Sequence, residues 1–124
     1  MNLNSLLEQA KIAASIASEE ILKVYHSGDF EIEAKDDQSP LTRADQAAHQ
    51  VIAAILEKTG IPILSEEGTQ IPFSQRKNWE TFWMIDPLDG TKEFIKRNGE
   101  FTVNIALIHH HQPIIGVVQT PVTD

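Results

Sequence analysis

The sequence has no cysteine, few aromatic residues and few basic ones. Without cysteine, disulfide-stapled scaffolds, thiolate metal sites and cysteine nucleophiles are excluded. Lys and Arg number 10 against 18 Asp and Glu, which gives a formal net charge of −8. Binding to a nucleic-acid backbone or to an anionic membrane needs a basic face, so this charge argues against both. The acidic balance fits a protein that gathers carboxylates around cations.

Long apolar runs are also missing. No run approaches the roughly 18 residues of a membrane span. Glu8, Lys11 and Glu19 interrupt the N-terminal segment, which is therefore unlike a signal peptide. We expect no integral membrane segment and a cytoplasmic location, with peripheral attachment to the inner membrane left open. The length of 124 residues suits a single domain, 1–124, with one core.

Two helices are predicted from apolar residues at spacings of three and four. The first covers residues 2–25, with Ser5 and Glu8 as a capping box. The second begins near Leu41 or Thr42 and runs to Thr59, where Gly60 is a stop signal. Their alanine-rich apolar sides indicate close packing against another element.

Short β-branched or alternating runs predict the strands, which cover residues 30–34, 61–64, 79–85, 103–108 and 114–120. The last two form a hairpin around residues 109–113. Residues 69–78 are predicted to be a polar loop with one helical turn. The order α-β-α-β-β-(α)-β-β indicates a mixed α/β fold with helices packed on a sheet.

Acidic residues stand at the ends of three of these elements. Glu66 and Glu67 follow the strand 61–64, Asp86 and Asp89 close the strand 79–85, and Asp45 lies in the first turn of the second helix. Such positions converge at one edge of a sheet. Magnesium prefers oxygen ligands of this kind.

The residues between and after Asp86 and Asp89 favour a turn that brings their two carboxylates toward one ligand. Pro87 fixes φ and Gly90 frees the backbone, so a tight turn there aims both carboxylates and the Leu88 carbonyl at a common point.

Each acidic segment taken alone also fits an ordinary structure. Asp-Pro and Asp-Gly are common turn dipeptides, Glu66-Glu67 fits a solvated loop, and Asp45 suits a helix start because of the dipole. The functional interpretation depends on their occupying corresponding ends of adjacent elements. The run His109-His110-His111 alternates in direction, so its rings cannot all face one ion, and we interpret it as a solvated turn.

Three motifs in one order resemble a known family. They are Ser39-Pro40-Leu41-Thr42-x-Ala44-Asp45, Ser65-Glu66-Glu67 and Trp83-x-x-Asp86-Pro87-x-Asp89-Gly90-Thr91-x-x-Phe94. Together they resemble the magnesium-dependent, lithium-inhibited inositol monophosphatase superfamily. Residues 89–107 look most like its bacterial 3′(2′),5′-bisphosphate nucleotidases, because inositol monophosphatases usually carry Asn-Phe where this chain has Glu93-Phe94.

The resemblance implies a fold and a metal site. The fold is the N-terminal half of the layered α/β/α/β/α sandwich of the inositol monophosphatase and fructose-1,6-bisphosphatase-like proteins. Two or three Mg²⁺ ions, with Mn²⁺ as a substitute, are expected on Glu66, Asp86, the Leu88 carbonyl and Asp89.

The resemblance also implies catalytic and substrate-binding residues. The catalytic set is Glu66, Thr91 and Asp45, of which the last two orient or activate a water. The set expected to contact substrate comprises Glu66, Leu88, Asp89, the backbone N–H groups of Gly90 and Thr91, and Lys35.

The implied reaction removes the 3′-phosphate of 3′-phosphoadenosine 5′-phosphate, giving AMP and phosphate, in sulfur assimilation and nucleotide metabolism. The expected partner is thus a small nucleotide. Two other candidates are an inositol-phosphate phosphatase and a metal- or nucleotide-binding fragment without catalysis. A haloacid-dehalogenase-like nucleophile motif has one residue between its aspartates, whereas Pro87 and Leu88 make two here.

Family members are roughly twice as long, and their Trp-Asp-x-Ala motif, which supplies a ligand of the second metal, is absent from this sequence. We therefore expect an incomplete site and a weak or inactive phosphatase at this length. A pure folding unit is the remaining candidate. An exposed strand edge after Thr120 is expected to favour self-association.

Overall fold

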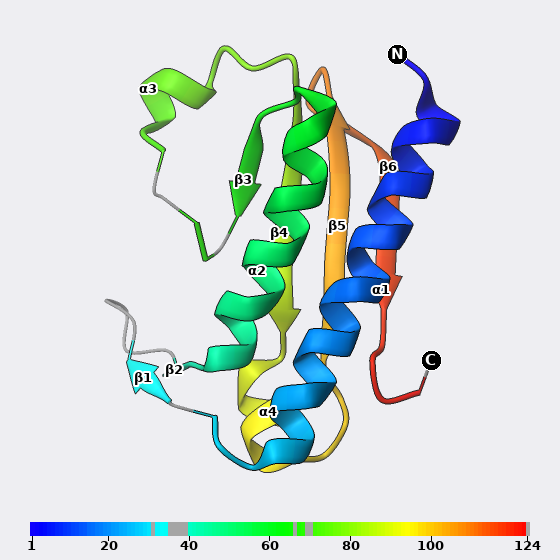
Figure 1. Cartoon of the computed structure of the whole chain (residues 1–124). Coiled ribbons are helices and arrows are strands. Elements are labelled where there is room, and N and C mark those ends of the chain that lie inside the picture. Colours follow the sequence, from blue (N-terminus) through cyan, green and yellow to red (C-terminus); the bar gives the residue numbers. More distant parts are fainter. Residues whose placement is uncertain (31, 35–39, 66, 69–70, 124) are drawn as a thin grey trace.

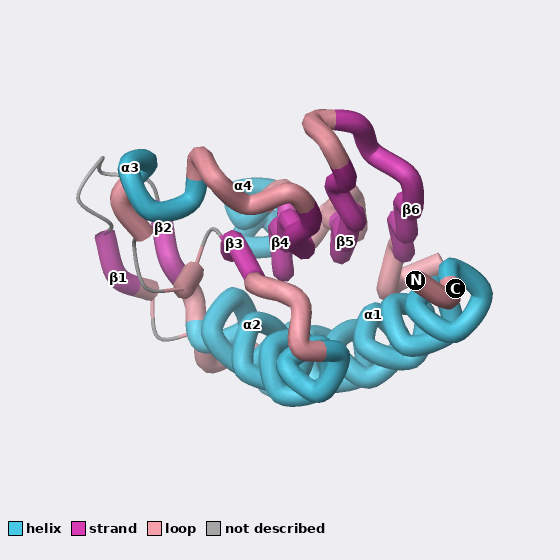
Figure 2. Tube along the Cα trace, turned by 90° about the horizontal axis from the view of Figure 1, so that it is seen from above, coloured by secondary structure: helices cyan, strands magenta, loops and turns pink. Residues whose placement is uncertain are grey.

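Two long helices cover one face of a four-stranded sheet (Figure 1, Figure 2). The computed structural model describes residues 1–30, 32–34, 40–65, 67–68 and 71–123. The sheet order is β3-β4-β5-β6, with strands Ile63–Ser65, Thr81–Asp89, Thr102–His109 and Gln112–Gln119. β3 runs parallel to β4, and the other neighbours are antiparallel. This is the mixed architecture that the order of elements predicts.

Helix α1 spans Leu3–Ser27 and buries an alanine-rich stripe. The expected Ser5–Glu8 capping box is wrong, because the helix begins earlier: the Asn2 side chain caps it by accepting the backbone N–H of Ser5 at 3.1 Å. Ser5 thus lies inside the first turn. Within the described part of the chain, no helix is both long and apolar enough to cross a membrane.

Helix α2 spans Arg43–Leu56 and continues as a 3₁₀ turn, η1, over Glu57–Thr59. Gly60 ends it with φ 74°, as the sequence predicts. α1 packs against α2, and both helices bury alanines, whose small side chains let neighbouring backbones approach closely. These alanines are Ala10, Ala13, Ala14, Ala17, Ala44 and Ala48.

The sheet follows the alternation of its strands. In β5, the side chains of Val103, Ile105 and Leu107 are buried, and the intervening residues are less so. The predicted hairpin is confirmed, with its turn at His110 and His111, whose φ values are 49° and 65°. Two consecutive positive φ values are typical of two-residue hairpin turns.

Several boundaries differ from the expected ones. The strand expected at residues 30–34 is reduced to β1, Glu33–Ala34, which pairs with the unpredicted β2, Pro40–Leu41. The expected helical turn is α3, Phe73–Arg76, and a further helix, α4, covers Thr91–Lys96. Strand β4 runs through Pro87 instead of ending before it.

An aromatic cluster of Phe30, Phe94 and Phe101 anchors α4 to the rest of the fold. Phe94 is fully buried, and its ring centroid lies 4.6 Å from that of Phe30 and 5.1 Å from that of Phe101. Burying one such side chain stabilises a fold by about 1.5–3 kcal/mol. The cluster therefore anchors the segment that follows β4.

The face of the sheet turned away from α1 and α2 carries exposed apolar side chains. Met84 is 46% exposed and Val118 70%. A hollow of about 360 Å³ lies on this face between β4, β5 and β6, over the small residues Ala106 and Gly116.

Candidate functional site

The acidic end of β4 is shaped by a β-bulge. Asp86 pairs with Asn104 and Asp89 with Thr102, so three steps on β4 face two steps on β5. The extra residue falls at Pro87-Leu88, where proline has no N–H to give to the ladder. A bulge bends the strand and redirects its side chains. The side chains of the two aspartates therefore do not follow the regular inward and outward alternation of the earlier residues of β4.

Asn104 links the two aspartates across the ladder. Its Nδ2 donates to Asp89 Oδ2 at 3.2 Å, and its backbone is paired with that of Asp86. Its Oδ1 is buried and makes no hydrogen bond within the described part of the chain. Asp86 is half-buried at one end of the hollow of about 360 Å³, while Asp89 is exposed. Carboxylates and an unpaired acceptor therefore meet at this end of the sheet.

Helix α4 starts immediately after the bulge. Gly90 has φ 93°, and a Cβ there would lie 3.0 Å from the Glu100 carbonyl oxygen. The next residue, Thr91, donates its hydroxyl to Asp45 Oδ1 at 2.9 Å, with the Leu88 carbonyl oxygen 3.4 Å away. This contact connects residues 46 positions apart and brings the two predicted catalytic side chains together.

Asp45 is fully buried and serves two segments with its two oxygens. Its Oδ2 accepts the backbone N–H of Thr42 at 2.8 Å and the Thr42 hydroxyl at 2.6 Å, completing a capping box at the start of α2. Its Oδ1 accepts the Thr91 hydroxyl. The helix cap and the bulge are therefore joined through one carboxylate.

The turn after β3 lies beside the bulge. β3 is parallel to β4 and Ser65 pairs with Ile85, so the turn begins next to Asp86. The Ser65 hydroxyl oxygen accepts the backbone N–H of Glu67 at 3.3 Å and lies 2.8 Å from His49 Nδ1. Burial lowers the pKa of His49, and the charge of Glu67 opposes that shift.

The structure assembles only part of the predicted site. Asp45, Thr91, the Leu88 carbonyl and the bulge lie together, whereas Glu66 and Lys35 lie outside the described residues. Among the residues described, no group of three or more acidic or histidine side chains is placed to hold a metal. The donors present near the bulge are two carboxylates and a backbone carbonyl, all of them hard oxygen ligands.

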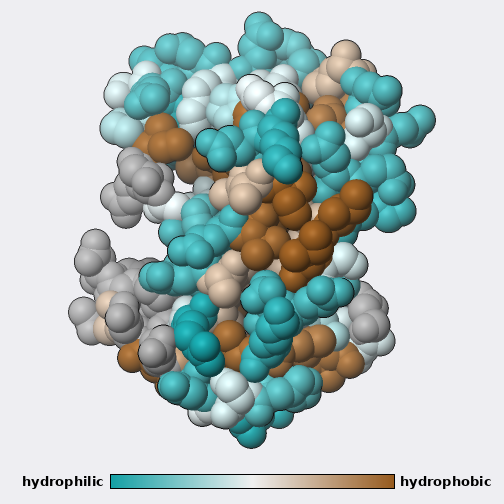
Figure 3. All heavy atoms as spheres, viewed as in Figure 1, coloured by the Kyte–Doolittle hydropathy of each residue, from teal (hydrophilic) through white to brown (hydrophobic). Residues whose placement is uncertain are grey.

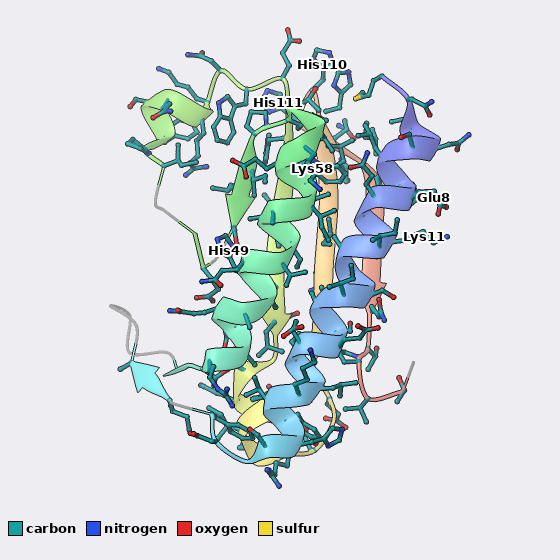
Figure 4. The ribbon with its side chains drawn as sticks, viewed as in Figure 1. Glu8, Lys11, His49, Lys58, His110 and His111 are labelled. Carbon is teal, nitrogen blue, oxygen red and sulfur yellow. The ribbon has the colours of Figure 1, made fainter. Side chains whose placement is uncertain are left out.

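The histidine run lies at the opposite end of the sheet. His110 and His111 are exposed at the β5–β6 turn, far from α4 (Figure 1, Figure 4). His109 is held by Thr81, with Oγ1 and Nδ1 2.7 Å apart.

Sequence reasoning missed His49 and Asn104. His49 stands four residues after Asp45, so both lie on one face of α2, and this spacing was a usable signal. Asn104 is the one polar residue in the run Val103–Leu107, on the side away from the helices. The usable signal was its polarity, and the structure adds that its Oδ1 is buried without a hydrogen-bond partner among the described residues.

Comparison with known proteins matches this chain to a protein family. A model described as the inositol monophosphatase family matches residues 2–124. The curated protein named 3′(2′),5′-bisphosphate nucleotidase CysQ of Escherichia coli (strain K12) is 49% identical over 120 residues, covering 94% of this chain and 48% of that protein. Its namesake from Haemophilus influenzae is 35% identical over 124 residues. The chain spans about half the length of these curated relatives.

Solved structures agree with the expected fold. CysQ from Bacteroides thetaiotaomicron superposes with a TM-score of 0.83 at 52% identity, covering 95% of this chain and 43% of that one. The extragenic suppressor protein suhB from Bartonella henselae gives a TM-score of 0.86 at 25% identity, covering 97% and 46%. The fold class predicted from the sequence is confirmed.

Proposed function

This chain belongs to the inositol monophosphatase family, and on that premise we propose that its protein is a Mg²⁺-dependent phosphomonoesterase. The proposed reaction removes the 3′-phosphate of 3′-phosphoadenosine 5′-phosphate, giving AMP and phosphate. The names of relatives near 50% identity support this substrate class over inositol phosphates. Such a reaction belongs to nucleotide recycling in sulfur assimilation.

One observation supports the site most directly. The hydroxyl of Thr91 donates to the buried Asp45 at 2.9 Å, immediately beside the Asp86–Asp89 bulge. With its proton donated to a carboxylate, the Thr91 oxygen has lone pairs left to accept a hydrogen bond from a water. The Asp45–Thr91 pair therefore orients a water next to the acidic end of β4.

The donor chemistry fits a hard divalent cation. Asp86, Asp89 and the Leu88 carbonyl would hold it, with Glu66 as a further proposed ligand. Bound Mg²⁺ would neutralise phosphate charge and lower the pKa of a coordinated water. Asn104 keeps the carboxylate of Asp89 in place. Lys35 and the backbone N–H groups of Gly90 and Thr91 are proposed to contact the phosphate.

Phosphate release from 3′-phosphoadenosine 5′-phosphate tests the proposal. It should require Mg²⁺ and fall by about 100-fold or more in Asp86→Asn, because a ligand carboxylate is lost. The matched control is Asp29→Asn, an exposed aspartate in the turn after α1, which should leave the rate unchanged. Inositol 1-phosphate, run in parallel, should react more slowly.

Two outcomes would contradict the proposal. The first is a wild-type rate in Asp86→Asn, and the second is a covalent phosphate trapped on Asp86. Binding of Mg²⁺ that depends on Asp86, with no phosphate release, would instead favour a binding fragment without catalysis for this chain.

A further inference from the structure

His49 on α2 contacts the turn after β3 at Ser65 and at Gly68. Figure 4 shows His49 on the side of α2 that faces β3 and the turn after it. The ring Nδ1 lies 2.8 Å from Ser65 Oγ, and both groups are partly buried. The ring also lines a hollow of about 490 Å³ between α2 and β3.

The direction of this hydrogen bond follows from the other partners of Ser65. Its oxygen already accepts the N–H of Glu67 at 3.3 Å, so its proton needs an acceptor. The neutral Nδ1 of His49 is an acceptor 2.8 Å away, and burial favours the neutral ring. His49 then carries its own proton on Nε2, a tautomer assigned from the hydrogen-bond network.

The far end of the turn is fitted to the same ring. A Cβ on Gly68 would lie 3.1 Å from His49 Cε1, so a side chain there would press on the ring. The Gly68 N–H closes the turn by donating to the Ser65 carbonyl at 3.3 Å. The turn is therefore bonded to His49 at its start and packed against it at its end.

We infer that His49 is a positioning residue that holds the Ser65–Gly68 turn against α2. Asp45 and His49 stand four residues apart, one helical turn, on the same helix. Asp45 holds Thr91 at the start of α4, and His49 contacts Ser65 and Gly68 in the turn after β3. One helix, α2, thus contacts both the start of α4 and the turn after β3, and so sets the spacing between them. The positioning role of His49 stands on these contacts alone. Its consequence for metal binding rests on the proposed function.

Amide hydrogen exchange at Glu67 and Gly68 tests this role in the full chain. His49→Ala should speed exchange at these two amides about fivefold or more, the worth of one net hydrogen bond. Amides inside α2 report any global loss of stability. His49→Asn, whose side-chain oxygen overlies Nδ1, should restore slow exchange. Gln50→Ala, an exposed neighbour on α2, is the matched control and should change nothing.

A spectroscopic measurement keeps the test independent of stability. The ¹⁵N shifts of His49 should show an unprotonated Nδ1 accepting a hydrogen bond, and Ser65→Ala should move the Nδ1 resonance. The inference is wrong if exchange at Glu67 and Gly68 in His49→Ala rises only as much as in α2. It is equally wrong if Ser65→Ala leaves the Nδ1 shift unchanged. Neither readout needs activity, so failure of the phosphatase proposal would leave both results interpretable.

Discussion

Single side chains in this protein serve two segments at once. Asp45 caps α2 through Thr42 and holds Thr91 beside the bulge, while being fully buried. A buried carboxylate is costly unless its oxygens are hydrogen-bonded, and here both oxygens are. Local capping and long-range assembly of the site are therefore coupled at one residue.

Gly90 is the residue whose substitution should disturb the site most directly through the backbone. Its φ of 93° and the Glu100 carbonyl oxygen 3.0 Å from a would-be Cβ both disfavour a side chain. Gly90→Ala should lower the free energy of unfolding by about 1–3 kcal/mol. Urea denaturation measures this loss. Gly116→Ala, where nothing lies within 4 Å, should change stability by less than about 0.5 kcal/mol. Equal losses in the two variants would contradict the strain argument.

Acid should weaken the fold through His49. Burial lowers its pKa below the ordinary 6.5, so just below pH 6.5 the unfolded chain binds more protons than the folded one. The stability that the neutral ring contributes is complete above pH 6.5 and is lost as the pH falls toward the folded-state pKa.

Urea midpoints at about pH 7.5 and about pH 5.5 measure this dependence. His49→Asn should reduce the difference between the two midpoints. His111→Asn, at an exposed turn position, should keep the wild-type difference. An unchanged difference in His49→Asn would show that other groups govern the acid response.

At the level of elements, the packed side of α1 is built from small residues. Ala10, Ala13, Ala14 and Ala17 are all fully buried, so this side, which packs against α2 and the sheet, has no room for longer side chains. The wider apolar surface of α1 is exposed: Figure 3 shows a hydrophobic patch over its middle, where Ile12 and Ile16 are 51% and 38% exposed.

Ala14→Leu should therefore force α1 away from the elements packed against it. We expect a loss of about 1–3 kcal/mol in unfolding free energy from overpacking. Ser15→Leu adds the same side chain one position later, on the exposed side of α1, and should cost less than about 0.5 kcal/mol. Thermal or urea unfolding distinguishes them, and a similar stability for both variants would mean that the alanine contact is loose.

For the whole molecule, we propose that the face of the sheet away from the helices takes part in self-association. β6 is an edge strand, and Val118 on it is 70% exposed beside an apolar hollow. Exposed apolar edges favour pairing with another chain. The sequence led us to expect self-association through a strand edge after Thr120. We propose that β6 and the apolar hollow beside it form the surface involved.

Val118→Lys should reduce concentration-dependent self-association of this chain, measured by sedimentation velocity. The added charge is costly to bury in a sheet-to-sheet contact. Ile12→Lys, at a comparably exposed apolar position on α1, is the control and should leave association unchanged. If both substitutions act alike, or neither acts, the association does not involve the β6 face.

The sequence by itself determined the main elements, the hairpin and the order of the three acidic motifs. Helical and strand periodicity, stop signals such as Gly60 and the pairing of nearby strands are local properties, which a single sequence displays. Even there, boundaries shifted: Asn2 caps α1 in place of Ser5, and β4 passes through Pro87.

Only the tertiary structure decided how the motifs meet. The bulge at Pro87-Leu88 depends on the register of β4 against β5, and the contact of Thr91 with Asp45 spans 46 positions. The bond between His49 and Ser65 likewise depends on how α2 packs beside β3. Such contacts arise because packing fixes the relative placement of elements, and local sequence carries no measure of that placement.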